Sequence, residues 1–463
     1  MDYISTRGKV QKCGFIDTFL KGLGDDGGLM IPETIPTVTK EMLAEWERLS
    51  YQDLMLAIFS LYANDEIPQE DLKELVYASY AGFRSEEVTP VTALNDSLYI
   101  LELYHGPTFA FKDIALQFMG NLYAYVAKKQ NKVIHILGAT SGDTGAAAIS
   151  GVRSREGIRI CILHPHGKVS RVQELQMTTV QDDNVLNLSV KGNFDDCQQI
   201  IKELFADLDF KTNYHLRAIN SINFVRILAQ TVYYFYAYFR LPAEAKAQGV
   251  SFSIPTGNFG NIFSGYLAKR MGLPIDKLIL ATNENNILQR FVHEGVYMPD
   301  KFHSTHSPSM DIQIASNFER YLYYLCGGNA NETAERMERF KADGKLVFDE
   351  SERERIRRDF AAHSVNGAEC LQMIQSYEGR YGYLLDPHSA CGVAAYEAVC
   401  KEEVCVSLAT AHPAKFDEAI SRCGIKQTFP QAIEQLFNKP QVQEIIEHNK
   451  QEVVERLERF FQS

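Results

Sequence analysis

One lysine of this 463-residue chain stands among aromatic and small residues, in the segment HGPTFAFKD (105–113). Its neighbours are aromatic or aliphatic, namely Phe109, Phe111 and Ile114, and they favour an apolar pocket around Lys112. Desolvation disfavours the ammonium form of a lysine and makes the amine available for Schiff-base chemistry. Most lysines are solvated surface charges, so this interpretation depends on what else the chain can bind.

A turn rich in glycine, PTGNFGN (255–261), lies between a predicted strand at 250–254 and a helical run at 262–269. Glycines let the backbone approach an anion closely, and a helix N-terminus offers free amide donors and the positive end of its dipole. The segment is neither a Walker sequence nor a G-x-G-x-x-G fingerprint. A phosphate cradle and a plain strand-to-helix turn therefore explain it about equally well.

A second turn, ATSGDTGAAA (139–148), has the same setting after a predicted strand at 133–137. Ser141, Thr144 and nearby backbone amides could bind a carboxylate or a second phosphate. Taken alone, the segment is more simply a helix start capped by Asp143 or Thr144. A phosphate cradle together with a desolvated lysine suggests a cofactor that carries both an aldehyde and a phosphate.

The elements that position these residues alternate between strand and helix from about residue 98 onward, which is typical of α/β units around largely parallel sheets. Before them, apolar residues recur at helical spacing between 40 and 82. The charged stretch 329–359 is predicted to be exposed helix, and the last thirty or so residues an amphipathic helical tail. The predicted strands are 98–103, 133–137, 158–163, 185–190, 250–254, 278–281 and 404–408, and the predicted helices include 197–205 and 223–239.

Composition excludes several classes of protein. Apolar residues make up 45% of the chain and charged residues 23%, as in ordinary soluble globular proteins. A net charge of −12 argues against nucleic-acid binding, which needs a basic face. Nine cysteines without a C-x-x-C pair, and histidines without ligand spacing, favour free thiols in a reducing cytoplasm over disulfides or a metal site.

The N-terminal segment MDYISTRGKVQKCGF lacks the apolar stretch of a signal peptide, and the aromatic-rich window 231–239 is too short to span a bilayer. We therefore expect a cytoplasmic protein without a membrane partner. The length predicts more than one packed unit. We expect a mainly helical N-terminal region at 1–95, an α/β lobe at 96–250 with Lys112 and SGDTG, and a larger α/β lobe at 251–463 with GNFGN and C-terminal helices.

Four segments, HGPTFAFKD, SGDTG, GNFGN and LATAHPAKF (408–416), occur in an order and at separations that resemble the threonine synthases, which are pyridoxal-phosphate enzymes of fold type II. The resemblance runs from GLGDDGGLMIP (22–32) to the end of the chain. It implies two open, mostly parallel sheets flanked by helices, preceded by the mainly helical N-terminal region of the longer subgroup. It also implies pyridoxal 5'-phosphate (PLP) as the cofactor.

Under this resemblance, Lys112 carries the cofactor and moves protons during the reaction. The GNFGN turn holds the cofactor phosphate through backbone amides, Thr410 faces the ring nitrogen with its hydroxyl, and Asp143 lies near the ring hydroxyl. The implied cofactor-binding residues are Lys112, Asp143, Gly257, Asn258, Phe259, Gly260, Asn261 and Thr410.

The implied reaction converts O-phospho-L-homoserine and water into L-threonine and phosphate. NSINFVR (220–226) resembles the segment that binds the substrate phosphate, and the planar fork of Arg226 matches a phosphate. Arg226 could instead cap or pair on a helix face, and Lys168 and Arg171 are further candidate cations. The implied substrate-binding residues are Ser141, Thr144, Asn220, Ser221 and Arg226.

Three alternatives stay open. A serine or threonine dehydratase of the same fold would share the cofactor site but would not need Arg226. A catalytically silent, synthase-like protein would only bind a phosphorylated ligand, and the presence of Lys112 and Thr410 argues against it. A nucleotide-binding module would explain the glycine turns but not the lysine pocket. We expect a small-molecule substrate, no nucleic-acid partner and a monomer or homodimer.

Overall fold

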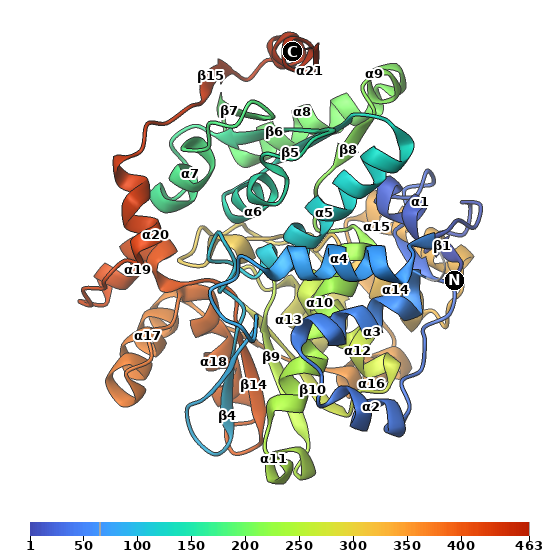
Figure 1. The fold of residues 1–463 in the computed structure, drawn as a ribbon. Coiled ribbons are helices and arrows are strands. Elements are labelled where there is room, and N and C mark those ends of the chain that lie inside the picture. Colours follow the sequence, from blue (N-terminus) through green and yellow to red (C-terminus); the bar gives the residue numbers. More distant parts are fainter. Residues whose placement is uncertain (64–65, 463) are drawn as a thin grey trace.

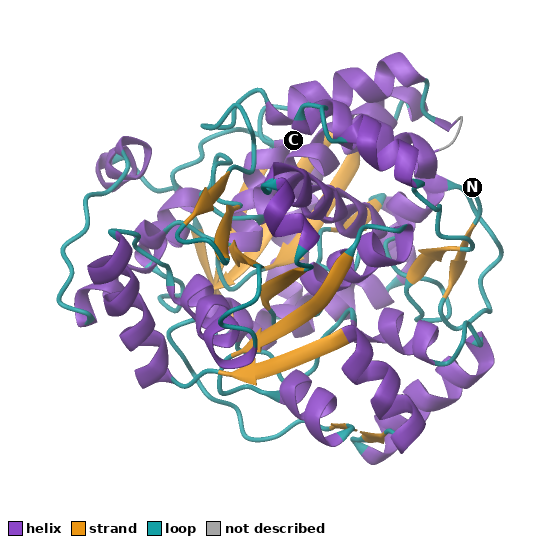
Figure 2. Ribbon diagram, turned by 90° about the horizontal axis from the view of Figure 1, so that it is seen from below, coloured by secondary structure: helices purple, strands orange, loops and turns teal. Residues whose placement is uncertain are grey.

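Two main sheets, one six-stranded and one five-stranded, organise the residues that the structure describes (Figure 1). The structure is a computed structural model, and it describes residues 1–63 and 66–462. Strands occupy the middle of the molecule and helices surround them (Figure 2). The predicted α/β architecture with mostly parallel sheets is confirmed.

The six-stranded sheet is parallel except at one edge, where β3 pairs antiparallel with β4. Its interior strands are short apolar runs that are buried on both faces, as a parallel sheet covered by helices requires. In spatial order the strands are β13 (Phe360–Ser364), β10 (Ile275–Thr282), β9 (Val250–Pro255), β14 (Cys405–Ala409), β4 (Leu98–Glu102) and β3 (Val91–Ala93).

The five-stranded sheet is parallel throughout. One of its faces packs in a separate apolar cluster with two amphipathic helices, α8 (Phe194–Ala206) and α21 (Lys450–Gln462). In spatial order the strands are β15 (Glu444–Glu447), β7 (Val185–Lys191), β6 (Ile158–Pro165), β5 (Ile134–Ala139) and β8 (Leu216–Ala218).

Two helices that begin at predicted site residues cross at very close range. They are α5 (Lys112–Gln130) and α6 (Asp143–Val152). A Cβ atom on Gly120 would lie 1.9 Å from the carbonyl oxygen of Gly151, so only glycine permits this crossing. A third helix, α10 (Phe224–Arg240), is buried along almost its whole length and packs against α5. Tight packing of these helices fixes the residues at their N-termini relative to one another.

The helical structure predicted between 40 and 82 is present as three helices, and that predicted in 329–359 is present as two. The helices outside those already named are α1 (Phe15–Lys21), α2 (Lys40–Trp46), α3 (Tyr51–Ala63), α4 (Gln69–Tyr80), α7 (Arg171–Thr178), α9 (Leu208–Asn213), α11 (Ala243–Ala247), α12 (Gly260–Met271), α13 (Ile287–Glu294), α14 (Phe318–Leu325), α15 (Ala330–Asp343), α16 (Glu350–Asp359), α17 (Gly367–Tyr381), α18 (Pro387–Val399), α19 (Asp417–Arg422) and α20 (Gln431–Glu434). The 3₁₀ helices are η2 (Pro308–Met310), η3 (Pro413–Phe416) and η4 (Gln435–Asn438), and the short antiparallel pairs are β1 (Tyr3–Ser5) with β2 (Met30–Pro32) and β11 (Val296–Tyr297) with β12 (Leu346–Val347).

All seven predicted strands are present, with ends that differ by a few residues. The prediction of a continuous helical tail is wrong, because β15 interrupts it. Ile446 is buried and Ile445 is exposed. This alternation belongs to a strand with one covered face, and β15 pairs with β7 at the edge of the sheet.

The two sheets exchange strands across the predicted unit boundaries. β4, from the predicted lobe 96–250, lies in the six-stranded sheet, and β15, from the predicted lobe 251–463, lies in the five-stranded sheet (Figure 1). The division into 1–95, 96–250 and 251–463 stays a prediction. Among the described residues, no helix has the length and apolar character needed to cross a membrane.

Candidate active site

The loops that carry the predicted site residues follow the carboxyl ends of strands in both sheets. Thr410 follows β14 and GNFGN follows β9 in the six-stranded sheet, whereas SGDTG follows β5 and Asn220 follows β8 in the five-stranded sheet. Ligands of open α/β sheets bind in the crevice at this end of the strands. The Lys112 segment joins them through a backbone hydrogen bond of 2.8 Å from Phe111 N–H to the carbonyl of Thr410.

Lys112 is the first residue of α5 and is buried, with 9% of its surface exposed. Burial lowers the pKa of its ammonium group to about 8. The charges of Arg226 and Lys415 act in the same direction, and Asp143 opposes them. Its Nζ lies 3.5 Å from Oδ2 of Asp143. The predicted desolvated lysine is confirmed, with an amine that is partly neutral near physiological pH.

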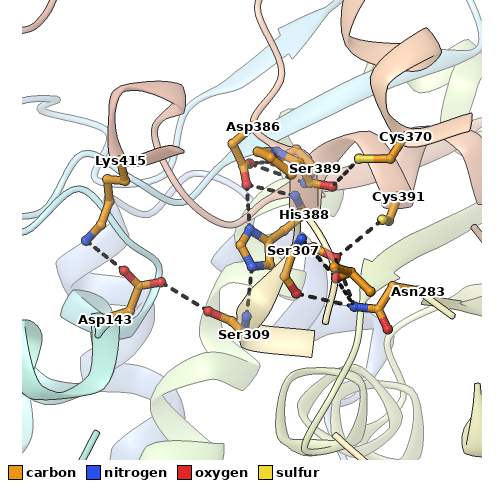
Figure 3. A network of polar contacts seen from close by, with 12 residues as sticks. Asp143, Asn283, Ser307, Ser309, Cys370, Asp386, His388, Ser389, Cys391 and Lys415 are labelled. Carbon is orange, nitrogen blue, oxygen red and sulfur yellow. Dashed lines mark hydrogen bonds and ion pairs between the residues drawn. The ribbon is translucent and has the colours of Figure 1, made fainter. Parts of the chain in front are cut away.

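Asp143, at the start of α6, is buried and lies at one end of the polar network in Figure 3, where Lys415 and Ser309 contact it. Its Oδ1 accepts hydrogen bonds from Lys415 Nζ and Gln173 Nε2, both at 2.8 Å. Its Oδ2 lies 3.5 Å from Lys112 Nζ and 3.4 Å from Ser309 Oγ. Burial raises the pKa of the Asp143 carboxyl, but Lys415 and Lys112 outweigh burial and hold the pKa well below its usual range. Asp143 is therefore a carboxylate shared between two lysines.

The interpretation of Asp143 or Thr144 as a helix cap is wrong. The N-cap position of α6 is Gly142, which caps with no side chain. Thr140 instead accepts hydrogen bonds from the N–H groups of Gly142 and Gly145, both at 2.9 Å. This leaves the Asp143 carboxylate available to the lysines.

The GNFGN turn leads into α12 with the geometry of an anion cradle. Phe259 has a φ of 62°, and the helix begins without a side-chain cap, so its first N–H groups are available to a ligand. A Cβ atom on Gly257 would lie 2.9 Å from the carbonyl oxygen of Ser309, and one on Gly260 would lie 3.2 Å from Nδ2 of Asn317. A side chain at position 257 would thus force the backbone to shift, whereas one at position 260 would need Asn317 to move by a few tenths of an ångström.

Asn261 supplies a side-chain donor in the same turn. Its Oδ1 accepts hydrogen bonds from the hydroxyls of Tyr233 and Tyr234. Its Nδ2 is buried and has no partner among the residues that the structure describes. Buried donors are normally paired, so this one fits a ligand acceptor such as a phosphate oxygen.

Arg226 lies in the first turn of α10 with 4% of its surface exposed. Within the described part of the chain it forms no ion pair, and Nη1 donates to the carbonyl of Asn220 at 3.3 Å. Burial lowers the pKa of its guanidinium to about 10. By contrast, the buried Arg320 donates to the carbonyls of Met30 and Ile222 and to the side chain of Asn317. The alternative of a capping or paired Arg226 finds no support, because its guanidinium keeps donors for an anion.

Two residues that the sequence did not reveal connect the GNFGN turn with the 220–226 segment. Asn317 Nδ2 donates to the carbonyl oxygens of Ser221 and Asn258, both at 3.1 Å. Ser316 Oγ lies 2.9 Å from Ser221 Oγ and donates to Asn258 Oδ1 at 3.1 Å. These contacts fix the 220–226 segment beside the GNFGN turn.

Lys415 is the other residue missing from the predicted set. It is fully buried, and Nζ donates to the carbonyl of Thr108 at 2.6 Å and to Gln176 Oε1 at 2.9 Å, besides Asp143. The signal was present, because Lys415 stands in the apolar segment LATAHPAKF. Because alanine and phenylalanine flank Lys415, its burial could have been predicted in the same way as that of Lys112.

The remaining predicted residues differ in exposure. Thr410 is buried, and its hydroxyl makes no hydrogen bond to any described residue. Ser141 is exposed in the loop before α6, and Thr144 is half-buried in the first turn of that helix. Lys168 is exposed, and Arg171 stacks on the ring of Phe437, at 4.6 Å, so neither is drawn into the network around Asp143.

A histidine for which no chemistry was predicted lies beside this network. His388 Nδ1 is 2.8 Å from Asp386 Oδ1, and its Nε2 accepts a hydrogen bond of 3.2 Å from the N–H of Ser309 (Figure 3). The contact holds the backbone of the residue whose carbonyl presses on Gly257. His388 therefore helps to hold Ser309, which packs against the GNFGN turn.

Three family profiles cover almost the whole chain. A profile described as threonine synthase N terminus matches residues 2–80, one described as pyridoxal-phosphate dependent enzyme matches 83–410, and one described as threonine synthase, C-terminal, matches 389–457.

Full-length relatives agree with the profiles. The chain is 45% identical to the threonine synthase of Pseudomonas aeruginosa, over 95% of this chain and 94% of that one. It is 46% identical to that of Saccharomyces cerevisiae, over 90% and 88%. The crystal structure of PLP-bound threonine synthase from Brucella melitensis superposes with a TM-score of 0.96 at 42% identity and covers 100% of both chains. Together with the geometry described above, these similarities place the chain in the threonine synthase family of PLP-dependent enzymes.

Proposed function

We propose that this chain converts O-phospho-L-homoserine and water into L-threonine and phosphate, with PLP held by Lys112. One observation carries the proposal. The buried Arg226, which has no carboxylate partner among the described residues, lies close enough to lower the pKa of the Lys112 amine. An amine for a cofactor aldehyde and a cation for a phosphate thus share one site.

The residues present fit PLP. The buried amine of Lys112 would hold the aldehyde, and the N-terminus of α12 with the unpaired Nδ2 of Asn261 would hold the phosphate. The unbonded hydroxyl of Thr410 would face the ring nitrogen, and Asp143 would lie near the ring hydroxyl. Bound PLP supplies an electrophilic aldehyde and a conjugated ring that accepts electrons.

Lys112 is placed to move protons on the substrate. A group whose pKa is about 8 exchanges protons readily near neutral pH. We assign to it removal of the proton from Cα of the substrate. Further transfers at Cβ follow, before phosphate leaves Cγ and water adds at Cβ. One lysine on one side of the cofactor suffices for these steps.

We assign to Arg226 the binding of the leaving phosphate. Negative charge grows on the leaving oxygen as its bond to Cγ breaks, and a fixed cation in a water-poor site stabilises that charge strongly. Asn220 and Ser221 precede Arg226 in the same segment, and Asn317 anchors that segment to the cofactor cradle. The substrate carboxylate is assigned to Ser141 and Thr144 at the start of α6.

Thr410 supports the choice of reaction. A neutral hydroxyl at the ring nitrogen leaves that nitrogen largely unprotonated, which weakens the electron sink. We infer that this favours chemistry at Cβ and Cγ of the substrate.

The proposal also includes a cytoplasmic location and a monomer or homodimer. All nine cysteines are free thiols, as expected in a reducing compartment.

The test is release of phosphate from O-phospho-L-homoserine by the purified chain, with L-threonine measured in the same samples. We expect the two products in equal amounts and only slow deamination of serine or threonine. A chain that deaminates serine or threonine efficiently and releases no phosphate from the phosphorylated substrate would be a dehydratase, and the proposal would be wrong.

A further inference from the structure

Lys415 is a lysine whose three donors are all matched inside the protein. It lies in η3, shortly after β14, and its ammonium group reaches a carboxylate, a backbone carbonyl and a side-chain amide. No part of its side chain is exposed. Its contacts therefore hold the ammonium group in one position beside Asp143.

The bonds of Asp143 are divided unequally between its two lysines. The oxygen that faces Lys415 has two partners at 2.8 Å, whereas the oxygen that faces Lys112 has its partners at 3.5 and 3.4 Å. The strong contacts therefore hold the carboxylate toward Lys415 and Gln173. Figure 3 shows Lys415 and Ser309 reaching Asp143 from different segments.

This division matters for the amine of Lys112. A buried carboxylate attracts an ammonium strongly because little solvent screens the pair. If Asp143 had Lys112 as its single cationic partner, the two groups would approach each other and the amine would stay protonated. A protonated amine cannot attack the aldehyde of a cofactor.

We propose that Lys415 is a positioning residue that holds Asp143 away from Lys112 and so keeps the Lys112 amine free to capture the cofactor. The inference rests on the proposed role of Lys112 as the cofactor lysine. It assigns to Lys415 a part in loading the enzyme that is separate from binding any substrate group.

The charged groups that act on Lys112 come from three elements. Asp143 on α6 stabilises the ammonium form, whereas Arg226 on α10 and Lys415 in η3 destabilise it. Neutralising Lys415 removes one repulsion and frees Asp143 to move toward the amine. Both effects raise the pKa of Lys112, so the pH at which its amine becomes neutral should rise.

The experiment follows capture of PLP by the full chain after the cofactor has been removed. Its rate is read from the visible absorbance of the lysine-bound cofactor between pH 6 and 10. For Lys415→Met we expect the pH midpoint of capture to move up by about one unit, which slows capture roughly tenfold at pH 7 and lets it recover at high pH. Lys415→Gln keeps hydrogen-bonding ability without the charge and is expected to show the same shift.

Three controls frame the result. Lys415→Arg keeps the charge and is expected to restore part of the wild-type midpoint. Asp143→Asn removes the attraction and is expected to move the midpoint down. Lys246→Met removes a lysine that is paired with Glu47 far from the site and is expected to change nothing.

A folded Lys415→Gln or Lys415→Met variant with the wild-type midpoint would overturn the inference. Equal slowing at every pH would also overturn it, because that is the signature of a merely structural role. Lys112→Ala separates this failure from failure of the proposed function. If that variant still forms the absorbance band, Lys112 is not the cofactor lysine.

Discussion

Replacing Arg226 with methionine is expected to remove most of the phosphate chemistry without weakening the folded chain. Arg226 is buried, forms a single hydrogen bond of 3.3 Å to Asn220, and has no carboxylate partner among the described residues. Its charge therefore destabilises the protein when no phosphate is bound. Methionine has a similar length and carries no charge.

The magnitudes follow from the site. A pKa that falls from 12.5 to about 10 corresponds to a cost of about 3 kcal/mol for the buried charge, because each pKa unit is worth about 1.4 kcal/mol. This cost is present at every pH below the folded pKa. Under the proposed function, the same guanidinium would make charge-assisted bonds to a bound phosphate that are worth about 3 kcal/mol together. We therefore expect kcat/KM to fall roughly a hundredfold, while Tm of the cofactor-free chain stays equal or rises.

The assay compares kcat/KM for phosphate release from O-phospho-L-homoserine with slow deamination of serine, which places no phosphate near Arg226. The loss is expected in the first reaction, and the absorbance of the bound cofactor is expected to stay intact. Arg226→Lys is expected to recover part of the activity, since an ammonium lacks the planar fork. Arg320→Met is a comparison variant at a buried arginine that donates to carbonyl oxygens, and there we expect loss of stability.

Two results would contradict this reasoning. Equal loss of both reactions would show that Arg226 acts through stability or through the general field of the site. An unchanged kcat/KM would show that the substrate phosphate binds elsewhere, and Lys168 and Arg171 would be the next residues to replace.

Three further predictions concern the cofactor site. Lys112→Ala is expected to fold with wild-type circular dichroism but to form no threonine and no band of lysine-bound PLP, and measurable turnover would refute its role. In the wild type, capture of PLP is expected to be half-maximal near pH 8 and faster above it, because the amine reacts and its pKa is about 8; a rate that falls with rising pH would contradict this. Gly257→Val is expected to lower PLP affinity at least tenfold, measured by equilibrium dialysis, because its Cβ would lie 2.9 Å from a carbonyl of Ser309. Unchanged affinity would show that the turn can shift to accommodate the valine side chain.

Much of the architecture could be predicted because its signals are local. A strand buried on both faces is a short apolar run, and glycine or a short polar side chain is favoured where a helix starts after it. These rules predicted the seven strands and the two glycine-rich turns between strand and helix. They failed for β15, since in its four residues, Glu444 to Glu447, one buried isoleucine stands beside an exposed one.

The parts of the site that escaped prediction are pairings between distant segments. Asp143 and Lys415 form an ion pair across more than 250 residues of sequence, and Asn317 joins two segments that are each far from it in the chain. No periodicity reports such a contact. Lys112 could be predicted because its own neighbours are apolar, whereas the role of Lys415 depends on which side chain the fold places opposite it.

The exchange of strands between the two sheets limits how far the chain can fold while it is being synthesised. β4 pairs with β14 across more than three hundred residues, and β15 pairs with β7 across more than two hundred and fifty. A ribosome therefore releases β14 and β15 long after β4 and β7, which until then have only β3 and β6 as neighbours. During most of synthesis the six-stranded sheet lacks an interior strand and the five-stranded sheet keeps an open edge at β7. Neither sheet can be completed until these C-terminal strands have emerged. The last stages of synthesis close both sheets together, which couples the maturation of the two halves of the site.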